Sequence, residues 1–112
     1  KRGDLFGKDT QRILHTDFDT YQAPQSGKEM YHATTAFCVA VQAWSRSTTF
    51  EQAIDNAVSA GGDTDTNAAI AGALSGATYG KVAMPKRWLA LHCKERFERA
   101  ALALLLRNTE EA

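Results

Sequence analysis

The sequence of 112 residues predicts an all-α fold, a helical bundle, on three observations. Apolar residues recur at spacings of three and four in successive segments, as they do along one face of an α-helix. Gly and Pro residues interrupt the pattern where helices are expected to end or begin. No segment alternates apolar and polar residues for more than a few positions, so no strand is expected. The length predicts one domain, which we divide into an irregular segment, residues 1–26, and a helical segment, residues 27–112.

Residues 1–26 contain little helical periodicity. Gly3, Gly7 and Pro24 interrupt them, and polar residues fill the intervals. A short helix is expected from Asp9 to about His15. Residues 16–20, Thr-Asp-Phe-Asp-Thr, are expected to form a loop.

Two helices are expected between Lys28 and Ala60. The first ends near Arg46, and its inward face is predicted to hold Met30, Thr34, Phe37, Val41 and Trp44. The second begins with a capping box, in which Thr48 and Glu51 satisfy each other's backbone N–H groups. Gly61 and Gly62 end it, because glycine tolerates the left-handed conformation found after helices.

The third expected helix runs from about Asp65 to Tyr79 and is small or apolar on all sides. A helix of this kind is predicted to be buried on all sides. Gly72 and Gly76 are expected to allow close approach of neighbouring backbones, and Gly80 ends the helix. A fourth helix is expected from Pro85, a favoured first-turn residue, through to Leu106.

Charge and cysteine content exclude several functional classes. Lys and Arg number 13 against 13 Asp and Glu, which argues against a general nucleic-acid or membrane-surface binder. The apolar run from Ala100 to Leu106 is too short to span a membrane. Cys38 and Cys93 are isolated and are expected to be reduced, packing as small apolar residues in a cytoplasmic protein. Without a signal peptide or an initiator Met, the chain is expected to be a piece of something longer.

The stretch from Gly61 to Asn67, GGDTDTN, carries the strongest chemical signal. Asp63, Asp65 and Thr66 offer oxygen ligands that suit Mg²⁺ or Mn²⁺, at the predicted start of a buried helix. A helix N-terminus also favours a substrate phosphate. The alternative is structural: Asp63 or Thr64 caps the helix, and Asp65 is a favourable first-turn residue.

The run from Ala60 to Gly80, AGGDTDTNAAIAGALSGATYG, resembles the signature of the ADP-ribosylglycohydrolase family. The resemblance covers about residues 27–92 and includes PKRWL at 85–89. It implies an all-α enzyme with a binuclear Mg²⁺ or Mn²⁺ centre. Such an enzyme hydrolyses the glycosidic bond between ADP-ribose and a modified side chain, so ADP-ribose or an ADP-ribosylated protein is the implied partner. The implied metal ligands are Asp63, Asp65 and Thr66, and the implied substrate-binding residues are Gly61 and Gly62.

The resemblance also implies a second half of the metal centre, with a Thr-Asp-Asp motif, that this sequence does not contain. The loop at 16–20 is a weak substitute and is better interpreted as polar surface. His32 is a candidate for lining the substrate cleft, with ordinary packing as the alternative, and Trp44 and Trp88 are expected in the core. The competing hypothesis is a non-catalytic helical fragment. Its apolar run from Leu102 to Leu106 would drive homo-oligomer formation or association with a missing N-terminal segment.

Overall fold

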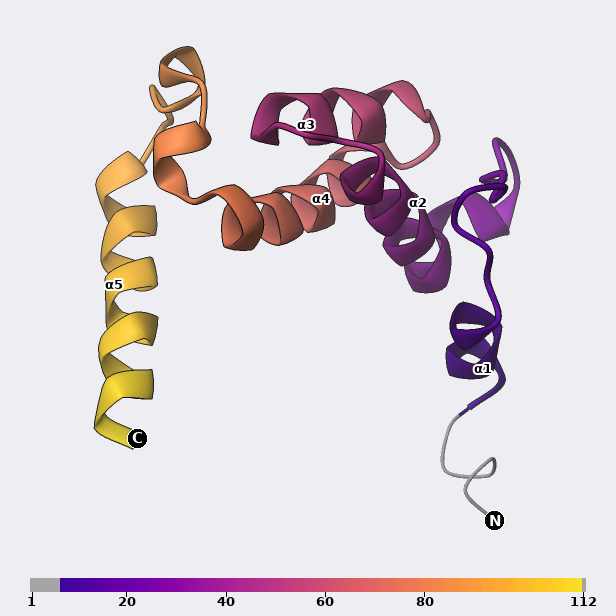
Figure 1. The fold of residues 1–112 in the computed structure, drawn as a ribbon, viewed down its shortest axis with the longest axis horizontal. Helices are drawn as coiled ribbons and strands as arrows, with labels where there is room; N and C mark the ends of the chain where they lie inside the picture. Colours follow the sequence, from indigo (N-terminus) through magenta and orange to yellow (C-terminus); the bar gives the residue numbers. More distant parts are fainter. Residues whose placement is uncertain (1–6, 112) are drawn as a thin grey trace.

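The computed structural model describes residues 7–111 and contains five α-helices there, with no strand in that range (Figure 1). This confirms the all-α prediction. The helices are α1 (Lys8–Leu14), α2 (Ala33–Ser45), α3 (Phe50–Ser59), α4 (Thr64–Tyr79) and α5 (Lys94–Glu111). Short 3-10 helices lie between them, namely η2 (Lys28–Tyr31), η3 (Lys81–Ala83) and η4 (Lys86–Trp88).

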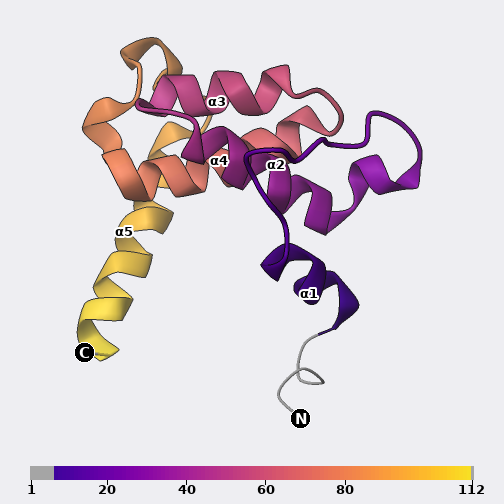
Figure 2. The ribbon, with the colours of Figure 1, turned by 45° about the vertical axis from the view of Figure 1, so that its right-hand side comes forward.

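The molecule has the shape of an arch. Helices α2, α3 and α4 pack together, and we call them the body. Helix α5, which we call the arm, and the smaller α1 extend from the body toward the same side in both ribbon views (Figures 1 and 2). The radius of gyration is 16.1 Å, against about 13 Å for a compact domain of this length. The described chain therefore leaves more surface open than a closed domain would.

The core of the body is made of small side chains. Ala40 and Ala43 of α2, Ala57 of α3 and Ala71 of α4 form it, with larger apolar residues packed around them. The face predicted for α2 is therefore wrong: Phe37 is 38% exposed, and the buried positions include the alanines that separate the larger residues. Alanine is inward because it lets three helices meet closely, which bulky side chains would prevent.

Helix α3 is capped one residue later than the sequence predicted. The Thr49 hydroxyl accepts a hydrogen bond from the Gln52 N–H (3.1 Å), and Gln52 Oε1 accepts one from the Thr48 N–H (2.8 Å). Gln52 thus takes the role expected of Glu51. The Glu51 carboxylate instead pairs with Arg87, beyond the end of α4.

Helix α4 is covered on one side only, so its predicted burial on all sides is wrong. Only Asn67, Ala71 and Ser75, spaced four apart, are fully buried on it. Gly72 does not mark an unusually close contact, since a Cβ there would lie 3.5 Å from Ile54 Cδ1, an ordinary distance. Gly80 ends the helix at a φ of +76°, as predicted.

The predicted fourth helix is broken. Pro85 precedes η4 and not a long helix, and Cys93 adopts a φ of +58° immediately before α5 begins at Lys94. Trp88, expected in the core, is half-buried beside Phe50, with ring centroids 6.3 Å apart. Trp44 is also only half-buried, and its indole N–H donates to Thr78 Oγ1 (2.8 Å).

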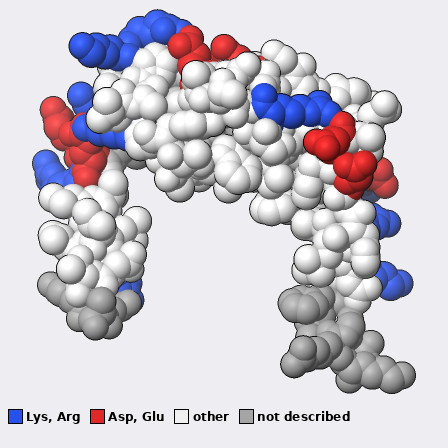
Figure 3. All heavy atoms as spheres, viewed as in Figure 1, with Lys and Arg blue, Asp and Glu red and all other residues white. Residues whose placement is uncertain are grey.

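The arm exposes its apolar residues. Exposed fractions are between 54% and 64% for Phe97, Leu102, Leu104, Leu105 and Leu106. In Figure 3 the charged residues of the arm gather near the body, and the more distant part is largely uncharged on this face. The Lys81 ammonium bonds the Glu98 carboxylate at 2.8 Å and connects the arm to η3. No helix in the described part of the chain is both long and apolar enough to cross a membrane.

Candidate metal-binding turn

The turn between α3 and α4 has a backbone that glycine favours. Gly61 and Gly62 have φ values of +77° and +70°, the left-handed region that other residues rarely adopt. The Gly61 N–H donates to the Val58 carbonyl (3.1 Å), and the Thr64 N–H donates to the Gly62 carbonyl (3.0 Å). Two consecutive left-handed residues reverse the chain, so the next residues begin α4 beside the end of α3.

Asp63 and Asp65 lie at the start of α4. Asp63 occupies the N-cap position, yet its side chain makes no capping hydrogen bond. Asp65 Oδ1 accepts a hydrogen bond from the Thr66 N–H (2.9 Å). The pKa of the Asp65 carboxyl is lowered from its ordinary value, first by a hydrogen bond with the Asp63 carboxyl and then by the Thr66 N–H. One residue separates Asp63 from Asp65, so both carboxyl groups belong to the N-terminus of α4.

The chemistry of these residues fits part of a divalent-cation site. Two carboxylates and the Thr66 hydroxyl are the hard oxygen donors that Mg²⁺ and Mn²⁺ prefer. Asp65 and Thr66 are exposed and Asp63 is half-buried, so the donors are accessible. Within residues 7–111, however, no three His, Cys, Asp or Glu side chains gather as a metal-binding group. We call Asp63, Asp65 and Thr66 the half-site.

The acidic loop at 16–20 uses its carboxylate locally. Asp17 Oδ1 accepts a hydrogen bond from the Asp19 N–H, and Asp17 Oδ2 accepts one from the Thr20 hydroxyl, both at 3.0 Å. This arrangement is that of a polar turn that stabilises itself.

Sequence reasoning missed the residues that support the turn from outside. Gln25 Nε2 donates to the Ala60 carbonyl at 2.9 Å, and a Cβ on Gly62 would lie 3.1 Å from Met30 Cγ. These contacts join positions about thirty residues apart in the chain. No local pattern signals them, because Gln25 lies in a segment without helical periodicity.

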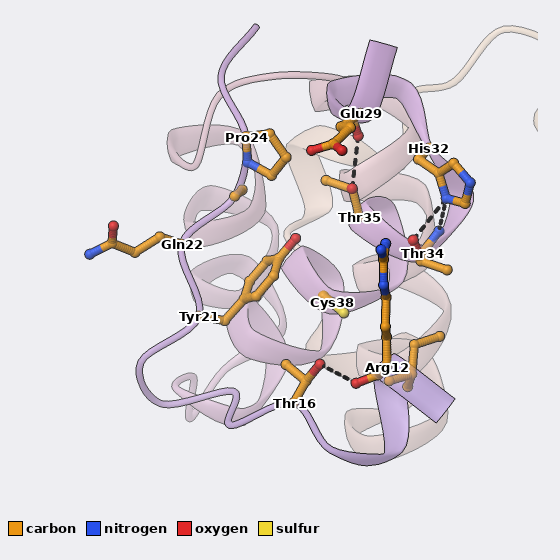
Figure 4. A pocket seen from close by; sticks show the side chains of 12 residues that line it. Arg12, Thr16, Tyr21, Gln22, Pro24, Glu29, His32, Thr34, Thr35 and Cys38 are labelled. Atoms are coloured by element: carbon orange, nitrogen blue, oxygen red, sulfur yellow. Dashed lines mark hydrogen bonds between the residues drawn. The ribbon is translucent and has the colours of Figure 1, made fainter. Parts of the chain in front are cut away.

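A cavity of about 700 Å³ lies beside the body, between α1, residues 16–24, η2 and the start of α2 (Figure 4). His32 lines it, and His32 Nδ1 accepts the Thr34 N–H (3.3 Å) as the N-cap of α2, which is a structural role. Burial raises the pKa values of the Tyr21 hydroxyl and the Cys38 thiol, which also line the cavity. A raised pKa keeps Cys38 a thiol, the less nucleophilic form.

The half-site residues are not among those lining the cavity. Pro24 connects the two regions: it lines the cavity, and its carbonyl oxygen lies 3.8 Å from where a Cβ of Gly62 would be. The structure thus places His32 at the cavity, and Asp63, Asp65 and Thr66 at a separate turn that shares one neighbouring segment.

Comparison with known proteins identifies the family. The family model described as ADP-ribosylglycohydrolase matches residues 5–112. The ADP-ribosyl-[dinitrogen reductase] glycohydrolase of Rhodospirillum rubrum is 30% identical over 83 residues, which cover 74% of this chain and 28% of that protein. The chain thus spans little more than a quarter of the relative's length. No solved structure matches. A family match over nearly all of the chain, containing the half-site turn, shows that the chain belongs to the ADP-ribosylglycohydrolase family.

Proposed function

We propose that this chain contributes one half of the divalent metal centre of a hydrolase. The proposed reaction is hydrolysis of the glycosidic bond that links ADP-ribose to a modified side chain. One observation carries the proposal: two carboxylates and a hydroxyl stand at the start of α4, and the Asp63 side chain makes no capping hydrogen bond. Family membership supports the reaction class.

Each residue of the turn has a separate role in this proposal. Asp63, Asp65 and Thr66 would hold Mg²⁺ or Mn²⁺, an ion whose positive charge polarises substrate oxygens and makes a neighbouring water more acidic. Gly61 and Gly62 allow the backbone to reverse beside the substrate. The partial positive charge at the N-terminus of α4 favours the diphosphate of ADP-ribose. The free Cys38 and Cys93 suit a reducing compartment, so we propose a cytoplasmic location.

Calorimetric titration of the chain with Mg²⁺ and with Mn²⁺, with and without ADP-ribose, tests the half-site. We expect ADP-ribose to tighten metal binding and the double substitution Asp63→Asn with Asp65→Asn to abolish it. The matched control is Asp55→Asn, which removes an exposed carboxylate from α3. Equal metal binding by the wild type and the double variant would refute the half-site.

Activity is tested in the longest reading frame that contains these 112 residues. Removal of either carboxylate is expected to reduce the release of ADP-ribose from an ADP-ribosylated protein by more than about tenfold, since metal affinity depends on the ligands and their partners. Asp55→Asn is again the control. Hydrolysis that is insensitive to chelators and to both substitutions would contradict the proposed metal dependence.

The second candidate function is a helical module that self-associates or binds a partner without catalysis. The exposed leucines of the arm favour it, because apolar residues gathered on one helix often mark an interface. Sedimentation measurements on the wild type and on Leu105→Glu separate the candidates. A dimer that the substitution dissociates, in a chain that binds no metal, would support the second candidate.

A further inference from the structure

Two amide side chains hold consecutive carbonyl groups of the turn before the half-site. Gln25 Nε2 donates to the Ala60 carbonyl (2.9 Å), and Asn67 Nδ2 donates to the Gly61 carbonyl (3.3 Å). Gln25 comes from the segment before η2, and Asn67 comes from the first turn of α4. The turn is therefore held from two separate parts of the chain.

The segment that contains Gln25 lies directly against the two glycines. A Cβ on Gly61 would lie 2.6 Å from Gln25 Oε1, nearer than real contacts allow. Because Gly61 has no side chain, the Gln25 amide has the space to lie across the turn. Gln25 Nε2 is also fixed on its own side, since it donates to the Ala23 carbonyl (3.2 Å).

We propose that Gln25 is a positioning residue for the Asp63 and Asp65 carboxylates. Three residues, Ala60, Gly61 and Gly62, separate the end of α3 from Asp63. Two of them are glycine, which has the largest conformational freedom of any residue. A hydrogen bond at Ala60 limits that freedom before a ligand arrives. Preorganisation of this kind lowers the entropic cost of binding, so it raises the affinity of the site it precedes. The inference deepens the proposed function and rests on it.

The substitution Gln25→Met tests the proposal without changing charge or length greatly. Methionine removes the donor, and Gln25 is exposed, so the global melting temperature should stay nearly unchanged. The matched control is Gln22→Met, in the same segment. Gln22 lines the cavity, and its side chain makes no hydrogen bond among the described residues.

Amide hydrogen exchange measures the turn directly and does not depend on a metal. In Gln25→Met we expect the Gly61 and Thr64 amides to exchange about twofold to tenfold faster, the range that one hydrogen bond supports. Both amides bond within the turn in the wild type. The Gly80 amide, bonded to the Gly76 carbonyl at the other end of α4, should exchange at the wild-type rate. Unchanged exchange at Gly61 and Thr64 would overturn the proposal.

Titration with Mn²⁺ then measures whether the rigidity of the turn affects metal binding by the half-site. We expect Mn²⁺ affinity to fall about twofold to tenfold in Gln25→Met and to stay unchanged in Gln22→Met. Faster exchange with unaltered Mn²⁺ affinity would overturn the positioning role while the half-site stands. No Mn²⁺ binding by the wild type would instead refute the proposed half-site and the role of Gln25 toward it, whatever the exchange rates show.

Discussion

The body and the arm both contain many apolar residues, but those residues have opposite environments. In the body, Ala40, Ala57 and Ala71 are wholly buried where α2, α3 and α4 meet. In the arm, the larger residues Leu104 and Leu105 are more than half exposed. Burial therefore depends on what each helix faces and not on how apolar its sequence is. We conclude that the body stabilises itself, whereas the arm contributes little stability to the described chain.

The largest expected effect comes from enlarging a buried alanine of the body. Ala71→Leu should lower the free energy of unfolding by about 1–3 kcal/mol, because the added methyl groups have no space between the helices. The same change in the arm, Ala103→Leu, should alter it by less than about 0.5 kcal/mol, because that site is exposed. Urea denaturation followed by circular dichroism measures both. Equal losses in the two variants would remove the distinction between the regions.

A smaller loss is expected from the cap of α3. Thr49→Ala removes the hydroxyl that accepts the Gln52 N–H and should cost about 1 kcal/mol. The control is Thr109→Ala in the arm, where the hydroxyl only donates to the Leu105 carbonyl of its own helix. Thermal unfolding of the two variants compares them. A Thr49→Ala chain as stable as the wild type would show that the cap is dispensable.

Removal of the arm should change the stability of the body even less. A chain ending at Cys93 is expected to retain nearly all of its free energy of unfolding, since an exposed ion pair is worth little. Urea denaturation of the shortened chain checks this. A loss comparable to that of Ala71→Leu would mean that the arm packs on the body in solution.

The smallest effect concerns the ion pair between the two regions. The Lys81 ammonium, through its hydrogen bond and its charge, lowers the pKa of the Glu98 carboxyl, and Lys94 adds a weaker effect. Lys81→Met should therefore raise the pKa of Glu98 toward its ordinary value, as measured by an NMR titration. Lys86→Met, which removes a lysine from η4, should leave it unchanged.

The sign of the pH dependence follows from the direction of that shift. Because the folded-state pKa of Glu98 is depressed, the contribution of the ion pair is complete above the ordinary glutamate pKa of 4.5. It is lost as the pH falls through the folded-state value. If the arm keeps its position against η3 in acid as it does at neutral pH, contacts other than this ion pair hold it there.

The sequence predicted helix locations better than helix surroundings. Four helices lie close to their predicted ranges, namely α1, the central part of α2, α3 and α4. Their ends were predictable because capping residues and glycines act locally. The inward face of α2 was wrong, since periodicity of large residues such as Phe37 does not show which neighbour a helix meets. The break at Cys93 was also missed, because its left-handed backbone has no signal in its residue type.

The half-site could be proposed from sequence for a related reason. Asp63, Asp65 and Thr66 are neighbours along the chain, so their chemistry is visible without a fold. The contact of Gln25 with Ala60 exists only after the segment before η2 folds against the turn. Their roles as metal ligands and as a positioning residue stay predictions until the titrations are done.

The alanine core also determines how uniquely the body can pack. A buried alanine has no side-chain torsion to order, so burying it costs no rotamer entropy. It also cannot settle into an alternative rotamer, as a buried leucine or methionine can. At Ala40, Ala57 and Ala71 the helix contacts therefore have no alternative rotamers, and rotamer freedom is left to the larger residues packed around them. The turn between α3 and α4 joins two such helices, so the close approach of their backbones limits how far residues 60–63 must reach.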